Sequence, residues 1–194
     1  MIAGSAGRAL GWLISLGLVV VASIAVATAP QSGTLADPFV RTGVQGEVVH
    51  ARVLDIQVTG VRAAEELDLV YDDTRLDTDG VWIVADLIVT SNVDLVQLQL
   101  TELRIDGIAY RVRELPYPDM TFTSYGPGVP VQGSFAFELP TSALEGDGLD
   151  DARIFFQESS SVQLDDVPEV IVDLTDVDVA RTAIIDEPVV LAVR

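Results

Sequence analysis

Apolar and polar residues alternate with a period of two over much of the chain after residue 47, which is the pattern of half-buried β-strands. The clearest strand covers residues 81–90, where apolar side chains fall on both faces. Because such a strand is typical of a sheet centre, we expect it to be buried on both sides. Residues 131–139 alternate as regularly, and the Asp106-Gly107 pair between two apolar runs predicts a two-residue hairpin.

The pattern is less regular elsewhere. It changes phase between Val53 and Leu54, which predicts a bulge or a change of face within one long strand. Residues 63–71 fit either a helical turn or a strand, and residues 72–80 have the composition of a turn. Residues 175–194 are expected to add one or two strands or an extended tail. Further short strands are expected over residues 95–103, 152–156, 162–164 and 170–174.

No segment after residue 30 shows a helical stripe longer than about two turns. About seven to nine short strands separated by turns predict an all-β domain, an antiparallel β-sandwich. Two sheets packed face to face need no disulfide at this length, because a domain of about 150 residues buries enough surface to hold itself together.

The N-terminal segment has a different pattern. Residues 9–29 contain no charged residue, and as a helix they would cross a bilayer core of about 30 Å. Arg8 precedes them and acidic sequence follows, so the positive-inside rule places the N-terminus in the cytoplasm and residues 31–194 outside. The alternative is a cleaved signal peptide, which would make the protein secreted. We favour an uncleaved anchor, because the apolar run is longer than a usual signal core.

The chain is therefore expected to have three parts. Residues 1–30 would be a signal anchor or transmembrane helix, residues 31–46 a linker, and residues 47–194 the β-sandwich domain. The linker range is rich in Pro, Gly, Ser and Thr, and it fits a first loop of the domain equally well.

Composition narrows the range of functions. The 194 residues include 30 acidic and 11 basic ones, giving a formal net charge of −19, and all of the basic residues are arginine. Ordinary nucleic-acid binding is disfavoured, since phosphate contacts need a basic surface. The lack of Cys and Lys excludes disulfides, thiol nucleophiles, Cys-ligated zinc and lysine-based sites.

Few residues are suited to catalysis. His50 is the one histidine, and neighbouring carboxylates on a strand point to opposite faces, so we expect no enzyme. A carboxylate-dependent hydrolase is the weakest alternative.

Calcium is the one cofactor that the carboxylates suggest. Residues 77–80, with Asp77 and Asp79, match part of a calcium-binding loop, and Asp72 and Asp73 are close in sequence. However, Arg75 would occupy the first ligand position and would repel the ion. A solvated turn is the competing interpretation, and no other cofactor is expected.

Loop 114–130 is the best candidate for recognition. It holds four large side chains among four prolines, namely Tyr117, Met120, Phe122 and Tyr125. Long loops at the end of a sandwich often bind partners. The alternative is that these side chains fold back and cap the core. The acidic segment 163–178 would either attract a basic partner or protect an edge strand from pairing.

Three stretches together resemble a known family. Residues 80–92 are similar to a "G-x-[aromatic]-V-V" strand that ends in Thr-Asn, and residues 103–110 to an "L-x-D-G-x-x-Y" hairpin. Residues 126–128 and 133–140 are similar to its "P-G…G-x-h-x-F-E-h-P" return strand, where h is apolar. In this order they resemble bacterial extracytoplasmic immunoglobulin-like domains of unknown function, whose sandwich is shared with a small secreted mycobacterial immunoprotective antigen.

That resemblance covers residues 48–174 and implies an immunoglobulin-like sandwich behind a membrane or lipid anchor. It departs from the family at Ser91, which interrupts the usual Thr-Asn pair, and in the tail after Leu174. The family has no agreed catalytic residues, so none is carried over. We therefore expect a non-enzymatic binding module on the bacterial cell membrane, with another envelope protein as its partner. A calcium-stabilised structural module of the envelope is the alternative.

Overall fold

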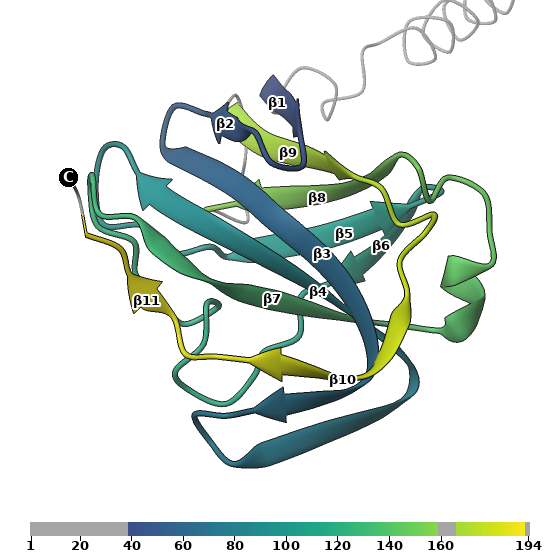
Figure 1. Ribbon diagram of the computed structural model, residues 1–194. Coiled ribbons are helices and arrows are strands. Elements are labelled where there is room, and N and C mark those ends of the chain that lie inside the picture. The colour runs from purple at the N-terminus through teal and green to yellow at the C-terminus, as the bar shows by residue number, and fades with distance from the viewer. Residues whose placement is uncertain (1–38, 159–165, 193–194) are drawn as a thin grey trace, which may run out of the picture. The chain divides into compact units, whose positions relative to one another are not determined.

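The computed structural model describes residues 39–158 and 166–192, which form eleven strands and one 3-10 helix (Figure 1). The strands are β1 (Phe39–Val44), β2 (Val48–His50), β3 (Leu54–Leu69), β4 (Thr74–Ser91), β5 (Leu100–Ile105), β6 (Ile108–Arg111), β7 (Val131–Leu139), β8 (Ala152–Gln157), β9 (Asp166–Val172), β10 (Val179–Ile185) and β11 (Val189–Val190). The helix η1 covers Thr141–Leu144, between β7 and β8.

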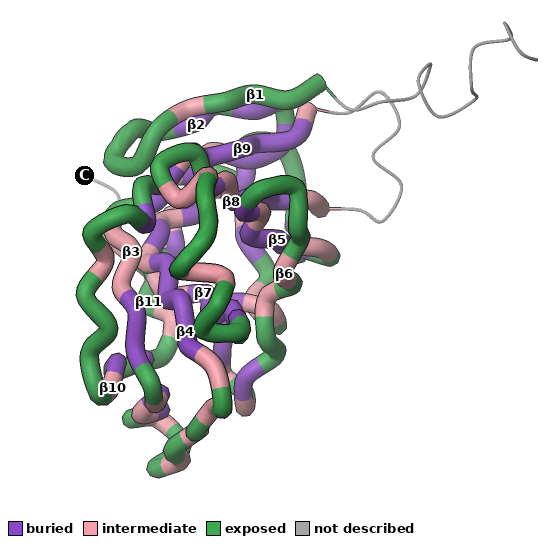
Figure 2. Tube along the Cα trace, turned by 90° about the vertical axis from the view of Figure 1, so that its right-hand side faces the viewer, coloured by how far each residue is buried: buried purple, intermediate pink, exposed green. Residues whose placement is uncertain are grey.

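The strands form two sheets packed as a β-sandwich. The five-stranded sheet has the order β1-β9-β8-β5-β6, and the six-stranded sheet has the order β10-β3-β4-β7-β11, with β2 paired to β3. The main apolar core lies between them, with buried side chains from β3, β4 and β7 on one side and from β5, β8 and β9 on the other. Figure 2 shows this buried interior between the exposed outer strands. The expected all-β sandwich is confirmed.

The central strand is β4, as the sequence predicts. All residues from Val81 to Ala85 are buried. One face, with Ile83 and Ala85, contacts the core between the sheets. The other face, with Trp82 and Val84, belongs to a second apolar cluster that includes a residue of loop 114–130 and residues of β10. Strand β4 is thus covered on both sides, because the chain folds back over the outer face of its own sheet.

The phase change at Val53 is a turn between two strands. Strand β2 pairs antiparallel with the start of β3, with His50 opposite Asp55, so the chain reverses within residues 51–53. A period-two pattern continues through a tight turn with shifted phase, which is why the sequence suggested one long strand.

The hairpin of β3 and β4 is longer than expected. Residues 63–69 belong to β3, and β4 begins at Thr74, so the turn predicted for residues 72–80 is confined to the first few of them. Arg75, Asp77 and Asp79 are exposed while the residues between them are partly buried. A solvated strand and a turn both use such polar residues, and composition does not separate them.

Two pairings correct the expectation of a purely antiparallel sandwich. Strand β1 runs parallel to β9, and β10 runs parallel to β3. Both strands come from the ends of the described chain and join sheet edges through long connections, which parallel pairing requires. Residues 39–44, within the range expected as a linker, therefore form a strand. Residues 95–99, expected as part of a strand, precede β5 as chain whose one β-bridge joins Val96 to Tyr125.

Two expectations concern residues that the structure does not describe. The membrane helix predicted at 9–29 and the short strand predicted at 162–164 lie outside the described ranges. Within residues 39–158 and 166–192, no helix is long and apolar enough to cross a bilayer.

Candidate functional site

Loop 114–130 is organised by one buried carboxylate, that of Asp119. This side chain is 4 % exposed. Its Oδ2 accepts a hydrogen bond from the Leu115 N–H at 2.8 Å. Its Oδ1 accepts bonds from the Thr121 N–H at 2.9 Å, the Thr121 hydroxyl at 2.7 Å and the Phe122 N–H at 3.1 Å. Several donors on one ionised acceptor fix the loop backbone, because each charge-assisted bond is stronger than a neutral one.

Two of the four candidate recognition residues are part of the core. Met120 and Tyr125 are 1 % and 0 % exposed, and both belong to the cluster between the sheets. The Tyr125 hydroxyl donates a hydrogen bond to the Met120 carbonyl oxygen at 2.8 Å. Burial, with the nearby Asp119 carboxylate, raises the pKa of the Tyr125 phenol. These two side chains cap the core, as the alternative interpretation of the sequence predicts.

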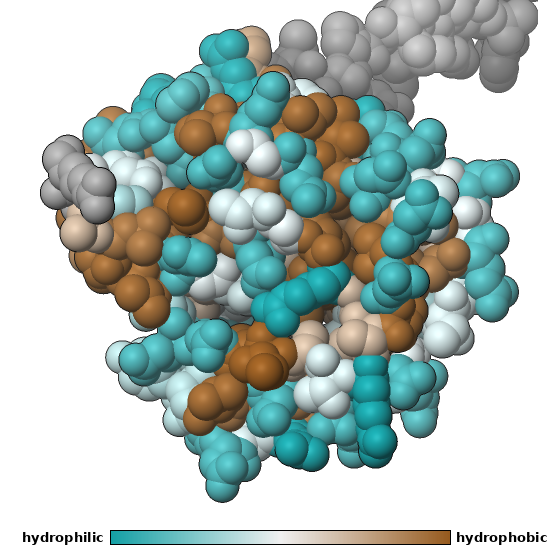
Figure 3. All heavy atoms as spheres, in the orientation of Figure 1, coloured by the Kyte–Doolittle hydropathy of each residue, from teal (hydrophilic) through white to brown (hydrophobic). Residues whose placement is uncertain are grey.

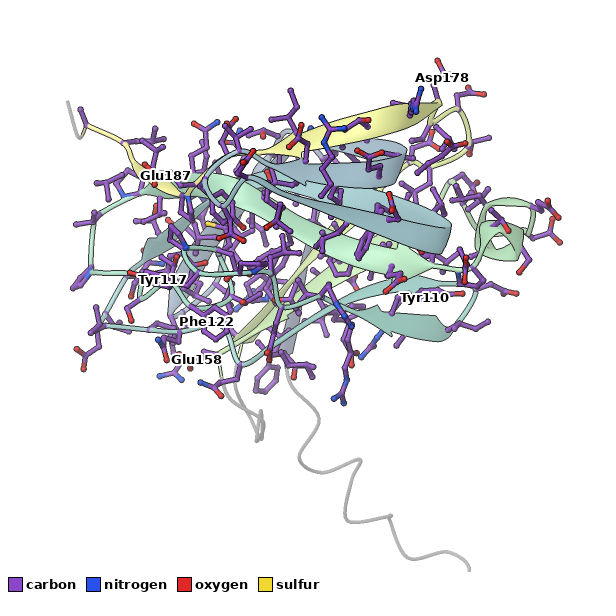
Figure 4. All side chains as sticks on the ribbon, turned by 90° about the horizontal axis from the view of Figure 1, so that it is seen from below. Tyr110, Tyr117, Phe122, Glu158, Asp178 and Glu187 are labelled. Atoms are coloured by element: carbon purple, nitrogen blue, oxygen red, sulfur yellow. The ribbon has the colours of Figure 1, made fainter. Side chains whose placement is uncertain are left out.

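The other two candidates, Tyr117 and Phe122, face solvent. Their exposed fractions are 78 % and 48 %. Figure 4 shows both toward the same end of the sandwich, away from the end that carries Tyr110 and Asp178. The candidate recognition surface therefore consists of Tyr117 and Phe122 on a backbone that Asp119 holds in place.

A groove runs beside Phe122. Its first part has a volume of about 240 Å³ and is lined by Phe122, Gln97, Gln99, Arg111 and Glu114, among others. A second part, of about 370 Å³, continues past the same two glutamines to Ser124. The Gln97 side-chain amide donates to the Ser124 hydroxyl at 3.1 Å. The groove thus offers amide donors and acceptors beside an exposed aromatic ring, which suits recognition of a polypeptide.

An apolar area adjoins the end of the same loop. Val129 is 37 % exposed, and the neighbouring Pro130 carbonyl accepts a hydrogen bond from the Leu191 N–H at 2.9 Å, just after β11. The two β11 residues, Val189 and Val190, are 52 % and 64 % exposed. Figure 3 shows a hydrophobic patch over β11, on a face where hydrophilic and other hydrophobic patches are mixed. Apolar side chains therefore lie at the end of loop 114–130 as well as at its middle.

A polar cluster that the sequence analysis did not single out lies on the outer face of the six-stranded sheet. Arg62 donates two hydrogen bonds to the Asp86 carboxylate, at 3.0 and 2.9 Å, and the Ser134 hydroxyl donates a third at 2.6 Å. A groove of about 470 Å³ lies over it, with Asp186 and Glu187 on its wall. The signal was present: Asp86 is the one charged residue in the apolar run 81–90.

The four aspartates considered for calcium do not converge. Asp72 and Asp73 lie in the turn before β4, and Asp72 accepts a hydrogen bond from the Thr74 hydroxyl at 2.8 Å. Asp77 and Asp79 lie on β4 itself. A strand rises about 3.3 Å per residue, so Asp79 lies about 16 Å along β4 from its first residue, Thr74, next to the turn that holds Asp72 and Asp73. In the described part of the chain, no group of three or more carboxylate or histidine side chains is arranged to hold a metal ion.

The acidic segment 163–178 is partly neutralised within the fold. Its first three residues lie outside the described ranges, and Asp166 forms an ion pair with Arg41 at 3.2 Å. Glu169 is 3 % exposed and accepts bonds from Thr42 at 2.8 Å and Arg153 at 2.9 Å. Strand β9 lies between β1 and β8, so it is an inner strand rather than an edge in need of protection.

Comparison with known proteins gives a fold neighbour but no family. No protein-family model matches the chain, and no curated protein matches it. A solved structure of an uncharacterised β-sandwich protein from Clostridium difficile 630 is similar, with a TM-score of 0.48 and 14 % sequence identity. The similarity covers 72 % of this chain and 98 % of that one.

Proposed function

We propose that this β-sandwich is a non-enzymatic binding module of the bacterial envelope, and that it recognises another envelope protein through loop 114–130. Residues 9–29 would hold it at the cell membrane in a single pass, with the N-terminus in the cytoplasm and the domain outside. If the segment is cleaved instead, the same module is secreted.

One observation carries the proposal. Tyr117 and Phe122 are exposed on a loop whose backbone is bound to the buried Asp119 carboxylate. Exposed aromatic residues are favoured at protein interfaces, and a loop that is already ordered loses little conformational entropy on binding. Exposed rings on a backbone that is held in this way favour a binding surface over a loop that is merely solvated.

The polar clusters support the non-enzymatic part. The Ser134 hydroxyl donates to Asp86, a carboxylate that Arg62 already engages through two bonds. His50, the base that a serine nucleophile would need, lies on the β2–β3 hairpin, where it pairs with Asp55 at 3.0 Å, and it does not line the groove that holds Ser134. The calcium-stabilised alternative gains no support from aspartates that lie apart along the chain.

Photo-crosslinking in intact cells tests the proposal. A photoreactive phenylalanine analogue replaces Phe122 in the full chain, and a matched variant carries it at Ile108 in the β5–β6 hairpin, which is 57 % exposed. We expect position 122 to form a discrete adduct with one envelope protein, identified by mass spectrometry. Position 108 should not form this adduct. Equal adducts from both positions, or none from position 122, would contradict the proposal.

A further inference from the structure

The backbone of Leu98 lies in a gap between two paired positions. On one side of the gap, Val96 and Tyr125 exchange two backbone hydrogen bonds, at 3.0 and 2.7 Å. On the other side, the Val112 N–H donates to the Thr101 carbonyl at 2.9 Å. In the described part of the chain, the N–H and C=O of Leu98 bond to no other backbone group. The ladder of backbone bonds is therefore interrupted at Leu98.

The free backbone groups of Leu98 face loop 114–130 rather than β8. The next residue, Gln99, donates its N–H to the Gln157 carbonyl of β8 at 2.8 Å. Val96, two residues before Leu98, bonds to the loop instead. Because N–H and C=O groups alternate in direction along an extended chain, those of Leu98 point the same way as those of Val96. The Leu98 side chain belongs to the core, and the residue lines the first part of the groove.

The two neighbouring segments that would close the gap turn away from it. Continuing the antiparallel pairing along the loop would place Thr123 opposite Leu98, but the Thr123 N–H donates to the Met120 carbonyl at 3.4 Å within the loop. After β6, the Arg113 N–H donates to the Ala136 carbonyl of β7 at 2.7 Å, so this segment joins the other sheet. The bonds that order these two segments thus leave the backbone of Leu98 open.

The groove at this gap already binds one amide group. The Gln97 side-chain amide crosses to the loop, where it donates to the Ser124 hydroxyl at 3.1 Å and to the Phe122 carbonyl at 3.5 Å. A side-chain amide and a peptide group offer the same kinds of donor and acceptor. The Gln99 side chain lines both parts of the groove, and the half-exposed Phe122 ring lies beside it. The surroundings of Leu98 therefore suit a peptide backbone with an apolar side chain over the ring.

We propose that the groove takes an extended segment of the envelope partner, whose backbone forms two hydrogen bonds with the N–H and C=O of Leu98. This inference rests on the proposed function, and it specifies which part of the partner is recognised. The N–H groups of the segment replace the exposed bonds of Gln97, and one apolar side chain covers the Phe122 ring. Backbone bonds of this kind supply affinity, while the ring selects the side chain.

The gap favours a peptide segment over a sugar chain. The positions on both sides of Leu98 are pairs of extended backbone, so the group that fits between them is another extended backbone. A peptide supplies one acceptor and one donor at the spacing of strand pairing. The hydroxyl groups of a sugar chain are not fixed at that spacing.

Charge restricts the segment further. The lining of the first part of the groove includes one base and one acid, Arg111 and Glu114. The chain as a whole has a formal net charge of −19, so it repels an acidic segment and attracts a basic one. We therefore expect a neutral or basic segment. Added salt should weaken the binding of a basic segment, because screening reduces the attraction.

Hydrogen exchange of single backbone amides, measured by NMR on the full chain in a mild nonionic detergent, tests the pairing. In the free protein the Leu98 amide should exchange at least tenfold faster than the bonded Val96 and Gln99 amides. The probe is a linear 12-residue peptide, selected on the full chain from a random phage-displayed library after removal of clones that bind Gln99→Trp. When this peptide is bound, exchange at Leu98 should slow at least tenfold, whereas exchange at Gln99 should not change.

Two variants and a second probe locate the bound peptide. Phe122→Ala should weaken binding at least tenfold. Gln132→Trp introduces the same large side chain as Gln99→Trp, but in the separate groove over Asp86, and it should leave binding unchanged. Chitohexaose, a neutral sugar chain, represents the other class of ligand and should not slow exchange at Leu98.

Several results would overturn the proposal. These are slow exchange at Leu98 in the free protein, the absence of clones that need the groove, unchanged exchange at Leu98 with the peptide bound, and equal binding by Phe122→Ala and Gln132→Trp. Protection of Leu98 by chitohexaose would overturn it as well. If position 122 still forms its discrete adduct in cells, any of these results leaves the proposed function standing, whereas loss of the adduct removes both.

Discussion

The carboxylate of Asp119 binds the backbone N–H groups of Leu115 and Phe122, at 2.8 and 3.1 Å, and so joins the two arms of one loop. Because Phe122 is one of the exposed rings, this contact connects a buried charge to the candidate recognition surface. Aromatic side chains in a long loop do not by themselves form a surface, and here the buried Asp119 binds the backbone on both sides of Tyr117.

Replacing Asp119 should loosen the loop and destabilise the domain. Asp119→Ala leaves several backbone donors without partners in a buried place, so we expect a loss of about 2–4 kcal/mol in the free energy of unfolding. Urea denaturation measures this loss, and limited proteolysis should show faster cleavage within residues 114–125. Asp77→Ala removes an exposed acid and should change stability by less than about 0.5 kcal/mol. Equal effects from both variants would show that Asp119 does not organise the loop.

Stability should fall at high pH because of two tyrosines. Burial, with Asp119 and Asp72 nearby, raises the pKa of Tyr71 to about 12, and the pKa of Tyr125 is raised further by the same kind of burial. The unfolded chain releases these phenol protons near pH 10, whereas the folded chain retains them. The folded state then binds more protons, so its stability decreases as pH rises above about 10.

The measurement is the urea midpoint between pH 8 and pH 11. Tyr125→Phe lacks the ionisable group, and its stability should decline less steeply over this range than that of the natural sequence. The slopes are compared rather than the absolute values, since the lost bond to Met120 costs about 1 kcal/mol at every pH. Parallel slopes would contradict the assigned cause.

Gly80 should not tolerate a side chain. A Cβ built at this position would overlap the backbone carbonyl of Leu139, which cannot move aside as a flexible side chain can. Gly80→Ala should therefore lower stability by about 2–3 kcal/mol. Gly146, where a Cβ would meet nothing within 4 Å, provides the control, and Gly146→Ala should be nearly neutral. Thermal melts of the two variants distinguish the outcomes, and similar melting temperatures would disprove the packing argument.

The pair of Arg62 and Asp86 should be modestly coupled. Their side chains are 37 % and 32 % exposed, so solvent screens the interaction. A double-mutant cycle with Arg62→Ala and Asp86→Ala should give a coupling of about 0.5–1 kcal/mol. A coupling near zero would mean that the bidentate contact does not contribute to stability. A much larger coupling would show that solvent screens this ion pair less than the exposed fractions of the two side chains indicate.

Much of the inner sandwich follows from the sequence for simple reasons. Most of residues 81–90 and more than half of residues 131–139 are buried, and a strand that faces a core must be apolar at positions that the period of two reveals. The Asp106-Gly107 turn can also be predicted from the sequence. Both residues adopt positive φ, of 47° and 75°, and a turn with this conformation favours this pair of residue types.

The outer strands are harder to predict. Strand β1 is almost wholly exposed, and the first part of β4 alternates only between exposed and partly buried residues, most of them polar, so the sequence shows little apolar alternation there. Parallel pairing of β1 with β9 depends on a partner 127 positions along the chain, at Thr42 and Glu169, which no local pattern contains.

The candidate site was half predictable. The composition of residues 114–130 identified an aromatic loop, but composition does not show which of its large side chains are buried. In the structure Met120 and Tyr125 are buried, whereas Tyr117 and Phe122 are exposed. A signal for Asp119 was available, since an Asp followed two residues later by Thr is typical of a turn held by its side chain.

The most direct test of the central claim combines both exposed rings. A photoreactive analogue at position 122 is introduced in the natural background and in Tyr117→Ser, and the yield of the adduct with the envelope protein is measured in intact cells. Tyr117 is 78 % exposed, so its replacement should leave the melting temperature unchanged. We predict that the adduct yield falls several-fold. An undiminished yield with equal stability would contradict a recognition surface formed by these two side chains.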